Sequence, residues 1–139
     1  MRRIWIAGLL GVAAVWAGMG YGALIANILL INAFPDAAAD AQVGKGTAVV
    51  RIGPSAAAAL YAVLWGVSVA TLLAAVQLGA LPAQAWWAMI SGPTGVAACV
   101  GLWRHAHEPQ ALRGPIVQTI LTALLYALGL SVGCCLAAA

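Results

Sequence analysis

Charged residues are scarce in this sequence and absent from its long apolar segments. The 139 residues include six Lys or Arg and three Asp or Glu. None of them lies within residues 4–35, 52–103 or 114–139. Because an ionised side chain at the centre of a bilayer costs about 2.5–3.5 kcal/mol, uncharged segments of this length are typical of membrane proteins. They also lack the ionisable groups on which proton relays depend.

The scarcity of charge is matched by an excess of apolar residues. These make up 65% of the sequence, against about 45–50% in an ordinary soluble domain. Together with the mean hydropathy of +1.03, this argues against a water-soluble fold. The net charge of +3 forms no basic run. We therefore expect the lipid bilayer as a partner and no nucleic acid.

Motifs that would indicate catalysis are also missing. The sequence contains no nucleophile–base pair, phosphate-binding glycine motif, CxxC or HExxH. Nothing therefore indicates an enzyme, and no cofactor is predicted. A bound lipid or quinone stays an alternative.

The apolar segments have the length of membrane spans, each of which needs about 20 residues. They predict an all-α membrane protein with a single integral membrane domain over residues 1–139. We expect an antiparallel bundle of four transmembrane helices with short loops, because such loops make neighbours of consecutive helices. The expected helices cover residues 4–32, 56–78, 84–103 and 115–137. A longer, Ala-rich polar loop is expected at residues 33–55.

Tryptophan marks the expected ends of the spans. Indole side chains prefer the level of the lipid headgroups. Trp16 and Trp65 lie deeper within the spans, where helix packing is the simpler interpretation and a ligand contact the alternative. The predicted interfacial anchors are Trp5, Trp86, Trp87 and Trp103.

Small residues recur at intervals of four along three of the expected helices. Such ridges let helix backbones approach closely in lipid. They indicate either a tightly packed monomer or surfaces left for a partner, through other membrane subunits or self-association. The predicted packing positions are Ala14, Gly18, Gly22, Ala26, Ala62, Gly66, Ala70, Gly129 and Gly133.

A break is expected in the middle of the third helix, at Gly92 and Pro93. Proline removes one backbone hydrogen bond and clashes with the preceding turn. A structural kink is the simpler interpretation. The alternative is a ligand site, since broken helices in transporters expose backbone groups at mid-membrane depth.

The densest polar cluster contains His105 and His107, which are candidate metal ligands. A stable site needs three or four ligands, which Asp36 or Asp40 could complete if the two polar loops share a membrane face. A solvated loop is the alternative. The adjacent Cys134 and Cys135 could capture a soft metal or pack as small apolar residues.

The leading functional hypothesis is a non-catalytic accessory or assembly subunit of a larger bacterial membrane complex, which could be respiratory, photosynthetic or a transport system. It rests on the missing cofactor motifs and on the surplus of small-residue faces. The alternative is a small homo-oligomer that binds or transports an apolar ligand, such as a quinone or lipid. A metal- or haem-binding membrane enzyme that uses His105 and His107 is the third hypothesis.

The expected location is the bacterial inner (cytoplasmic) membrane, crossed several times. Arg2 and Arg3 favour a cytoplasmic N-terminus, because the first helix usually dominates orientation. The two polar loops hold four of the six Lys and Arg residues. Their charge argues for the opposite orientation.

Overall fold

The computed structural model describes the backbone of residues 2–138 and the side chains of residues 11–138. Within these residues the chain is helical, with no strand. The elements are α1 (Arg2–Gln42), α2 (Ala48–Ile52), α3 (Pro54–Gln77), the 3-10 helix η1 (Ala83–Ser91), α4 (Gly92–His105), the 3-10 helix η2 (Pro109–Leu112) and α5 (Arg113–Ala138). η1 continues directly into α4, so together they form one helical segment.

Four helical segments are long and apolar enough to cross a membrane, judged by length and composition over the described residues. They are Gly11–Gln42, Pro54–Gln77, Ala83–His105 and Pro109–Ala138. The sequence therefore predicts the number of candidate spans correctly. The last three expected helices also agree with the observed bounds to within about two residues, as helix ends generally do.

The prediction of a long loop over residues 33–55 is wrong. α1 continues through Pro35 to Gln42, and α2 and the start of α3 occupy most of the rest. Residues 36–42 are rich in alanine, the residue with the highest helix propensity. Loss of hydropathy marks the end of an apolar segment, whereas the helix itself ends only where backbone chemistry stops it.

Glycine provides that stop at the ends of α1 and α3. Gly44 and Gly79 have positive φ angles of 72° and 69°, which cost glycine little. Gly44 N donates to Ala41 O and Lys45 N to Asp40 O, the paired bonds of a Schellman motif. The same pair of bonds follows α3, from Gly79 N to Val76 O and from Ala80 N to Ala75 O.

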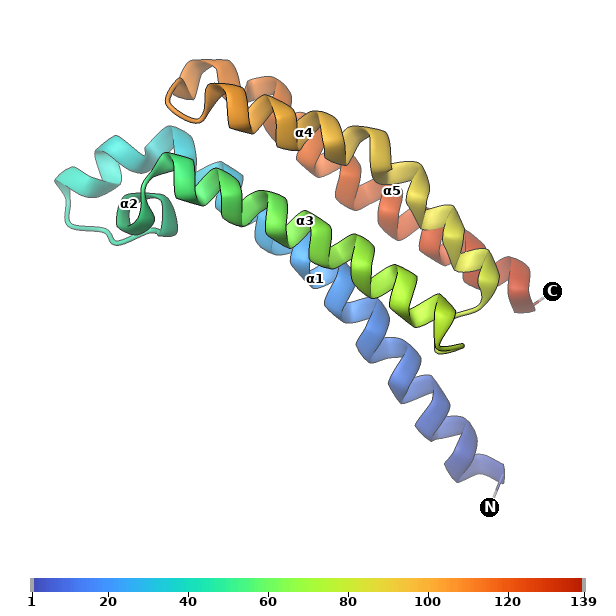
Figure 1. The fold of residues 1–139 in the computed structure, drawn as a ribbon. Helices are drawn as coiled ribbons and strands as arrows, with labels where there is room; N and C mark the ends of the chain where they lie inside the picture. Colours follow the sequence, from blue (N-terminus) through green and yellow to red (C-terminus); the bar gives the residue numbers. More distant parts are fainter. Residues whose placement is uncertain (1, 139) are drawn as a thin grey trace.

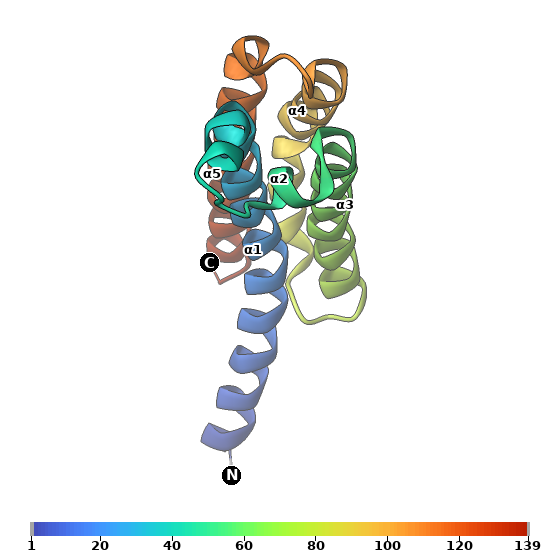
Figure 2. The ribbon, with the colours of Figure 1, turned by 90° about the vertical axis from the view of Figure 1, so that its left-hand side faces the viewer.

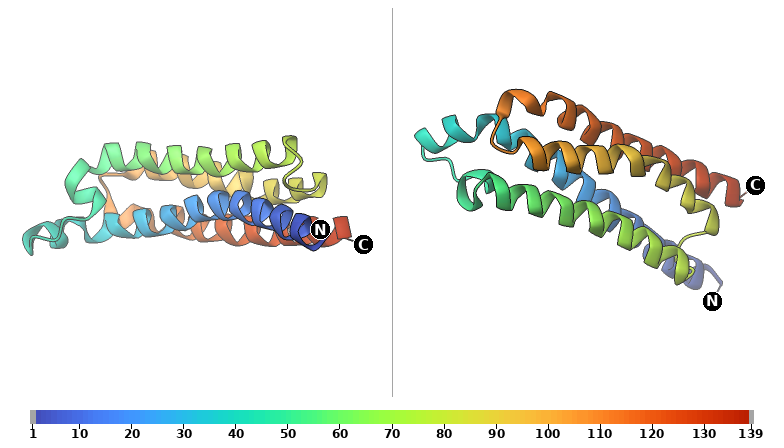
Figure 3. Two further views of the ribbon diagram at one scale, coloured as in Figure 1. Left: turned by 90° about the horizontal axis from the view of Figure 1, so that it is seen from below. Right: turned by 45° about the horizontal axis from the view of Figure 1, so that its top comes forward.

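The four long segments lie side by side in two layers. α1 and α5 form one layer, and α3 and η1–α4 form the other (Figure 2; Figure 3, left). Figure 1 shows the chain reversing direction at each connection between them. α1 packs against α3 and α5, while α4 also packs against α3 and α5. The N-terminal part of α1 extends beyond the other helices (Figures 1 and 2).

The buried side chains form two clusters along this arrangement. One lies toward α2 and includes Ile31, Tyr61 and Leu102, all almost fully buried. The other lies toward η1 and includes Leu72 and Tyr126. Most large apolar side chains outside these clusters are exposed, which is ordinary for helices that face lipid rather than water.

Candidate functional site

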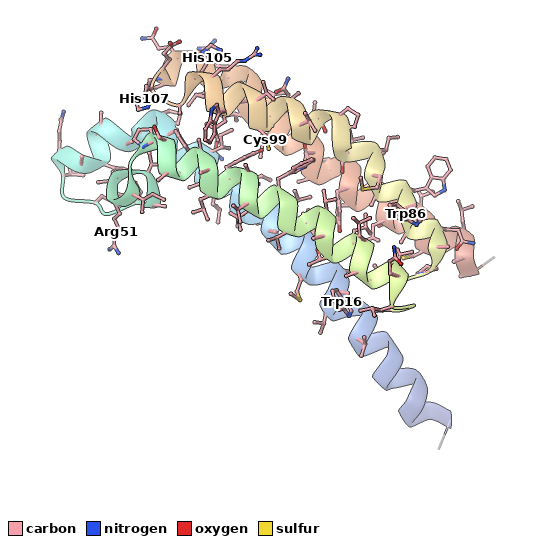
Figure 4. All side chains as sticks on the ribbon, in the orientation of Figure 1. Trp16, Arg51, Trp86, Cys99, His105 and His107 are labelled. Carbon is pink, nitrogen blue, oxygen red and sulfur yellow. The ribbon has the colours of Figure 1, made fainter. Side chains whose placement is uncertain are left out.

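The polar end of the molecule brings together the two polar connections. His107 Nε2 lies 3.0 Å from Ser55 Oγ, which joins the segment after α4 to the start of α3. His105 Nδ1 lies 3.2 Å from Glu108 Oε2. Lys45 Nζ forms an ion pair of 3.1 Å with Asp40. Figure 4 shows His105 and His107 at this end of the bundle.

The candidate metal ligands His105 and His107 have different partners in the structure, a carboxylate and a hydroxyl. Among the described residues, no three His, Cys, Asp or Glu side chains lie in a group that could hold a metal ion. Cys134 and Cys135 lie near the C-terminal end of α5, away from the histidines. A closed site of three or four ligands is therefore not assembled by these residues in the monomer.

The His107–Ser55 pair also lines a cavity of about 220 Å³, together with Trp103. A serine becomes a nucleophile when a histidine base is itself oriented by a third group. In the described part of the chain, the only hydrogen bond of the His107 ring is the one to Ser55. The pair therefore connects the segment after α4 to the start of α3.

Gly129 and Gly133 of α5 pack against the backbone of η1. A Cβ atom at Gly129 would lie 2.6 Å from the carbonyl carbon of Trp87 and 2.8 Å from Ala88 Cα. At Gly133 it would lie 2.6 Å from the carbonyl carbon of Gln84. These two glycines therefore allow the backbones of α5 and η1 to approach closely, at positions that the small-residue pattern predicts.

Most of the other predicted packing positions make no such contact within the chain. A Cβ atom at Gly18, Gly22 or Gly66 would meet no atom within 4 Å. Ala14 and Ala70 are exposed. These residues lie on helix faces turned away from the bundle, so a packing role for them, against a partner or a second copy, stays a prediction. Ala26 and Ala62 are only partly buried.

Other glycines, which the small-residue pattern does not include, also pack closely. A Cβ atom at Gly20 would lie 2.5 Å from Tyr126 Oη and 2.9 Å from Thr71 Oγ1, where α1, α3 and α5 meet. Gly95 lies directly beneath the indole of Trp65. Gly20 alternates with Gly18 and Gly22 in the sequence, so spacing alone does not tell which face is packed.

Polar side chains connect the helices inside the bundle. Asn27 Nδ2 donates to Tyr61 O at 3.0 Å, and Tyr61 Oη lies 2.7 Å from Thr119 Oγ1. Thr122 Oγ1 lies 2.9 Å from Thr94 Oγ1. Interhelical hydrogen bonds of this kind are common between membrane helices. They link α1 to α3, α3 to α5, and α5 to α4.

The predicted break at Gly92 and Pro93 coincides with a change of helix type. η1 ends at Ser91, and Gly92 begins α4 with Pro93 in its first turn. Proline is tolerated there because the first backbone N–H groups of a helix have no internal partner. Gly92 is only partly buried and Pro93 is exposed.

The described tryptophans fall into two groups, one exposed and one half-buried. Trp86, Trp87 and Trp103 are exposed at the two ends of the Ala83–His105 segment, and Figure 4 shows Trp86 at the end opposite the histidines. Trp16 and Trp65 are half-buried against the cluster near η1. The side chain of Trp5 lies outside the described residues. The interfacial role of the exposed three stays a prediction.

No family model, curated protein or solved structure matches this chain.

Proposed function

We propose that this protein is a non-catalytic integral membrane subunit that supports the assembly of a larger complex in the bacterial inner membrane. Its four apolar segments would cross the bilayer as an antiparallel bundle. The observation that carries the proposal is the outward face of α1, which contains Gly11, Ala14, Gly18 and Gly22.

This outward face of α1 combines exposure with small side chains. A Cβ atom at Gly11, Gly18 or Gly22 would meet no atom within 4 Å, and Ala14 is exposed. The opposite face of the same helix packs through Gly20 into the bundle. Since small residues allow close approach of helices in lipid, the outward face suits the transmembrane helix of another subunit.

The length of α1 supports the same proposal. At 41 residues it is about 60 Å long, twice the hydrocarbon thickness of about 30 Å. Its N-terminal part extends beyond the other helices (Figure 1). This part is not covered by the bundle, and a neighbouring subunit could shield it.

We also propose a cytoplasmic N-terminus. Arg2 and Arg3 precede the first span, and the segments from Asp36 to Arg51 and from Arg104 to Arg113 lie together at the other end of the bundle. A cytoplasmic N-terminus would put that charged end outside. Accessibility of an engineered cysteine at the exposed Val43 to an impermeant reagent tests this orientation: labelling in intact cells supports it, and labelling only after lysis contradicts it.

Native mass spectrometry after mild extraction from the source membrane tests the subunit role. We expect the wild-type chain in fixed stoichiometry with larger subunits. Gly18→Leu or Gly22→Leu should abolish that recovery, because a leucine side chain would hold the partner helix away. Gly66→Leu is the matched control, since Gly66 is equally open but lies on α3.

Two results would contradict the proposal. In the first, all three variants would recover the same partners as the wild type. In the second, the wild-type chain would appear alone as a homo-oligomer with a reproducible extra mass. That second result would favour the alternative function, a homo-oligomer that binds an apolar ligand.

A further inference from the structure

An apolar groove runs between α1 and α3 and ends at the start of α2. Its volume is about 440 Å³, within the range of about 300–1,000 Å³ typical of ligand sites. Ala26 and Leu29 of α1 line one side, and Leu60 and Leu64 of α3 line the other. Thr47 lies at the α2 end, and every other lining residue is alanine or leucine.

The groove is shorter than one bilayer leaflet. Its lining residues on α1 run from Ala26 to Ala33, a span of seven residues or about 10 Å along the helix. One leaflet of a hydrocarbon core about 30 Å thick is about 15 Å deep. The groove therefore matches about two thirds of the length of an acyl chain in one leaflet.

The helix whose start lines the end of this groove, α2, carries a cation, Arg51. Arg51 is one helical turn after Thr47, and its backbone N–H donates to Thr47 O at 3.0 Å. Its side chain lies against Gly46, with Nε 2.8 Å from the position of a Cβ atom there. Arg51 is exposed and projects from α2 away from the long helices (Figure 4).

The charge of Arg51 is not neutralised by the described part of the chain. The nearby carboxylate of Asp40 is already paired with Lys45 at 3.1 Å. Neither ion pair found among the described residues includes Arg51. An anion bound beside α2 would therefore meet an uncompensated guanidinium, which binds phosphate well.

A hydroxyl without a partner lies beside this cation. Thr47 Oγ1 is buried and has no hydrogen-bond partner among the described residues, although Thr47 occupies the N-cap of α2. Thr47 also lines the α2 end of the groove. An ester or phosphate oxygen bound there would give this hydroxyl a hydrogen-bond partner.

We propose that this groove binds one acyl chain of an anionic phospholipid, whose phosphate contacts Arg51. The occupant combines a negative headgroup at the level of Arg51 with an apolar chain that follows the groove. The inference needs the protein to lie in a membrane and does not depend on a partner subunit.

Lipid binding is measured by native mass spectrometry of the purified full-length chain in detergent. Dioleoylphosphatidylglycerol and dioleoylphosphatidylcholine are titrated separately. We expect retention of one phosphatidylglycerol and weaker retention of phosphatidylcholine. Arg51→Gln should weaken phosphatidylglycerol binding about fivefold, while Arg113→Gln, the control at another exposed arginine of the same end, leaves it unchanged.

A second pair of variants tests the groove itself. Ala26→Phe fills the groove and should remove the bound phosphatidylglycerol. Ala70→Phe, at an exposed alanine of α3 outside the groove, should not. Should Ala26→Phe fail to fold, the wild-type chain provides the test. Phosphatidylglycerol with a photoreactive acyl chain should then crosslink to the peptides that contain Leu29 or Leu60.

Three results would overturn the lipid proposal: equal losses in Arg51→Gln and Arg113→Gln, equal retention of both lipids, or crosslinks spread over all helices. A dimer mass that Ala26→Phe abolishes, with no lipid bound, would instead assign the groove to a second copy. The role as a subunit of a larger complex has a separate test. If the chain retained phosphatidylglycerol but no partner subunit, the subunit role would be contradicted and the lipid site would still stand.

Discussion

The contact between α5 and η1 makes a quantitative prediction for Gly129→Ala. The added Cβ atom would lie 2.8 Å from Ala88 Cα and 2.6 Å from the carbonyl carbon of Trp87. Since carbon atoms pack at about 3.5–4.0 Å, α5 would have to retreat by roughly 0.7 Å or more. Both neighbouring atoms belong to the backbone, so no side-chain rotation relieves the overlap.

The cost of this overlap is best measured against a matched substitution. Overpacking of a buried site costs about 1–3 kcal/mol, whereas replacing a mid-helix glycine by alanine gains about 1 kcal/mol of helix propensity. Gly66→Ala receives the propensity gain without the overlap, because Gly66 has open space around it. We therefore expect Gly129→Ala to be about 1–3 kcal/mol less stable than Gly66→Ala.

The assay is reversible unfolding in mixed micelles with increasing dodecyl sulfate, followed by circular dichroism. The double variant Gly129→Ala with Gly133→Ala should lose less than the sum of the two single losses, because one retreat of α5 makes room for both methyl groups. If Gly129→Ala proved as stable as Gly66→Ala, the close approach of α5 to η1 would be refuted.

Two further predictions concern α4. Thr122→Val should destabilise the protein by about 0.6 kcal/mol, and by at most about 1.7 kcal/mol, because it removes the hydrogen bond to Thr94. A double-mutant cycle with Thr94→Val that yields no coupling energy would contradict this prediction. Pro93→Ala should change the unfolding free energy by less than about 1 kcal/mol and leave assembly intact, since proline in a first helical turn replaces no hydrogen bond. The prediction would be contradicted by a large loss of stability in Pro93→Ala. It would also be contradicted if the wild-type protein bound an apolar ligand and Pro93→Ala did not, because the junction of η1 and α4 would then form part of a binding site.

The local chemistry of the sequence predicts much of the fold. Uncharged segments predict the four candidate spans, and the Gly92–Pro93 pair predicts the place where helix type changes. The loop prediction at residues 33–55 fails because hydropathy falls before helix propensity does. Alanine continues α1 to Gln42, and only the Schellman motif at Gly44 ends it.

The candidate site could be predicted only in part. The sequence indicates that both polar connections could meet at one end, and the structure joins them through Ser55 and His107. The sequence does not indicate the groove between α1 and α3, because that groove forms only when α2 lies across these two helices. Residues 48–52 are too few for periodicity to reveal a helix.

Composition and spacing alone determined that this chain is helical, apolar and long enough to cross a membrane four times. The tertiary structure decided which face of each helix is packed: Gly20 inward and Gly18 outward on α1, Gly129 and Gly133 against η1, and Gly66 open. The physical reason is that lipid tails and helix interfaces are both apolar. Hydrophobicity therefore shows which segments of this sequence suit the membrane and which suit water. Only the contacts between helices show which residues face the protein interior and which face lipid.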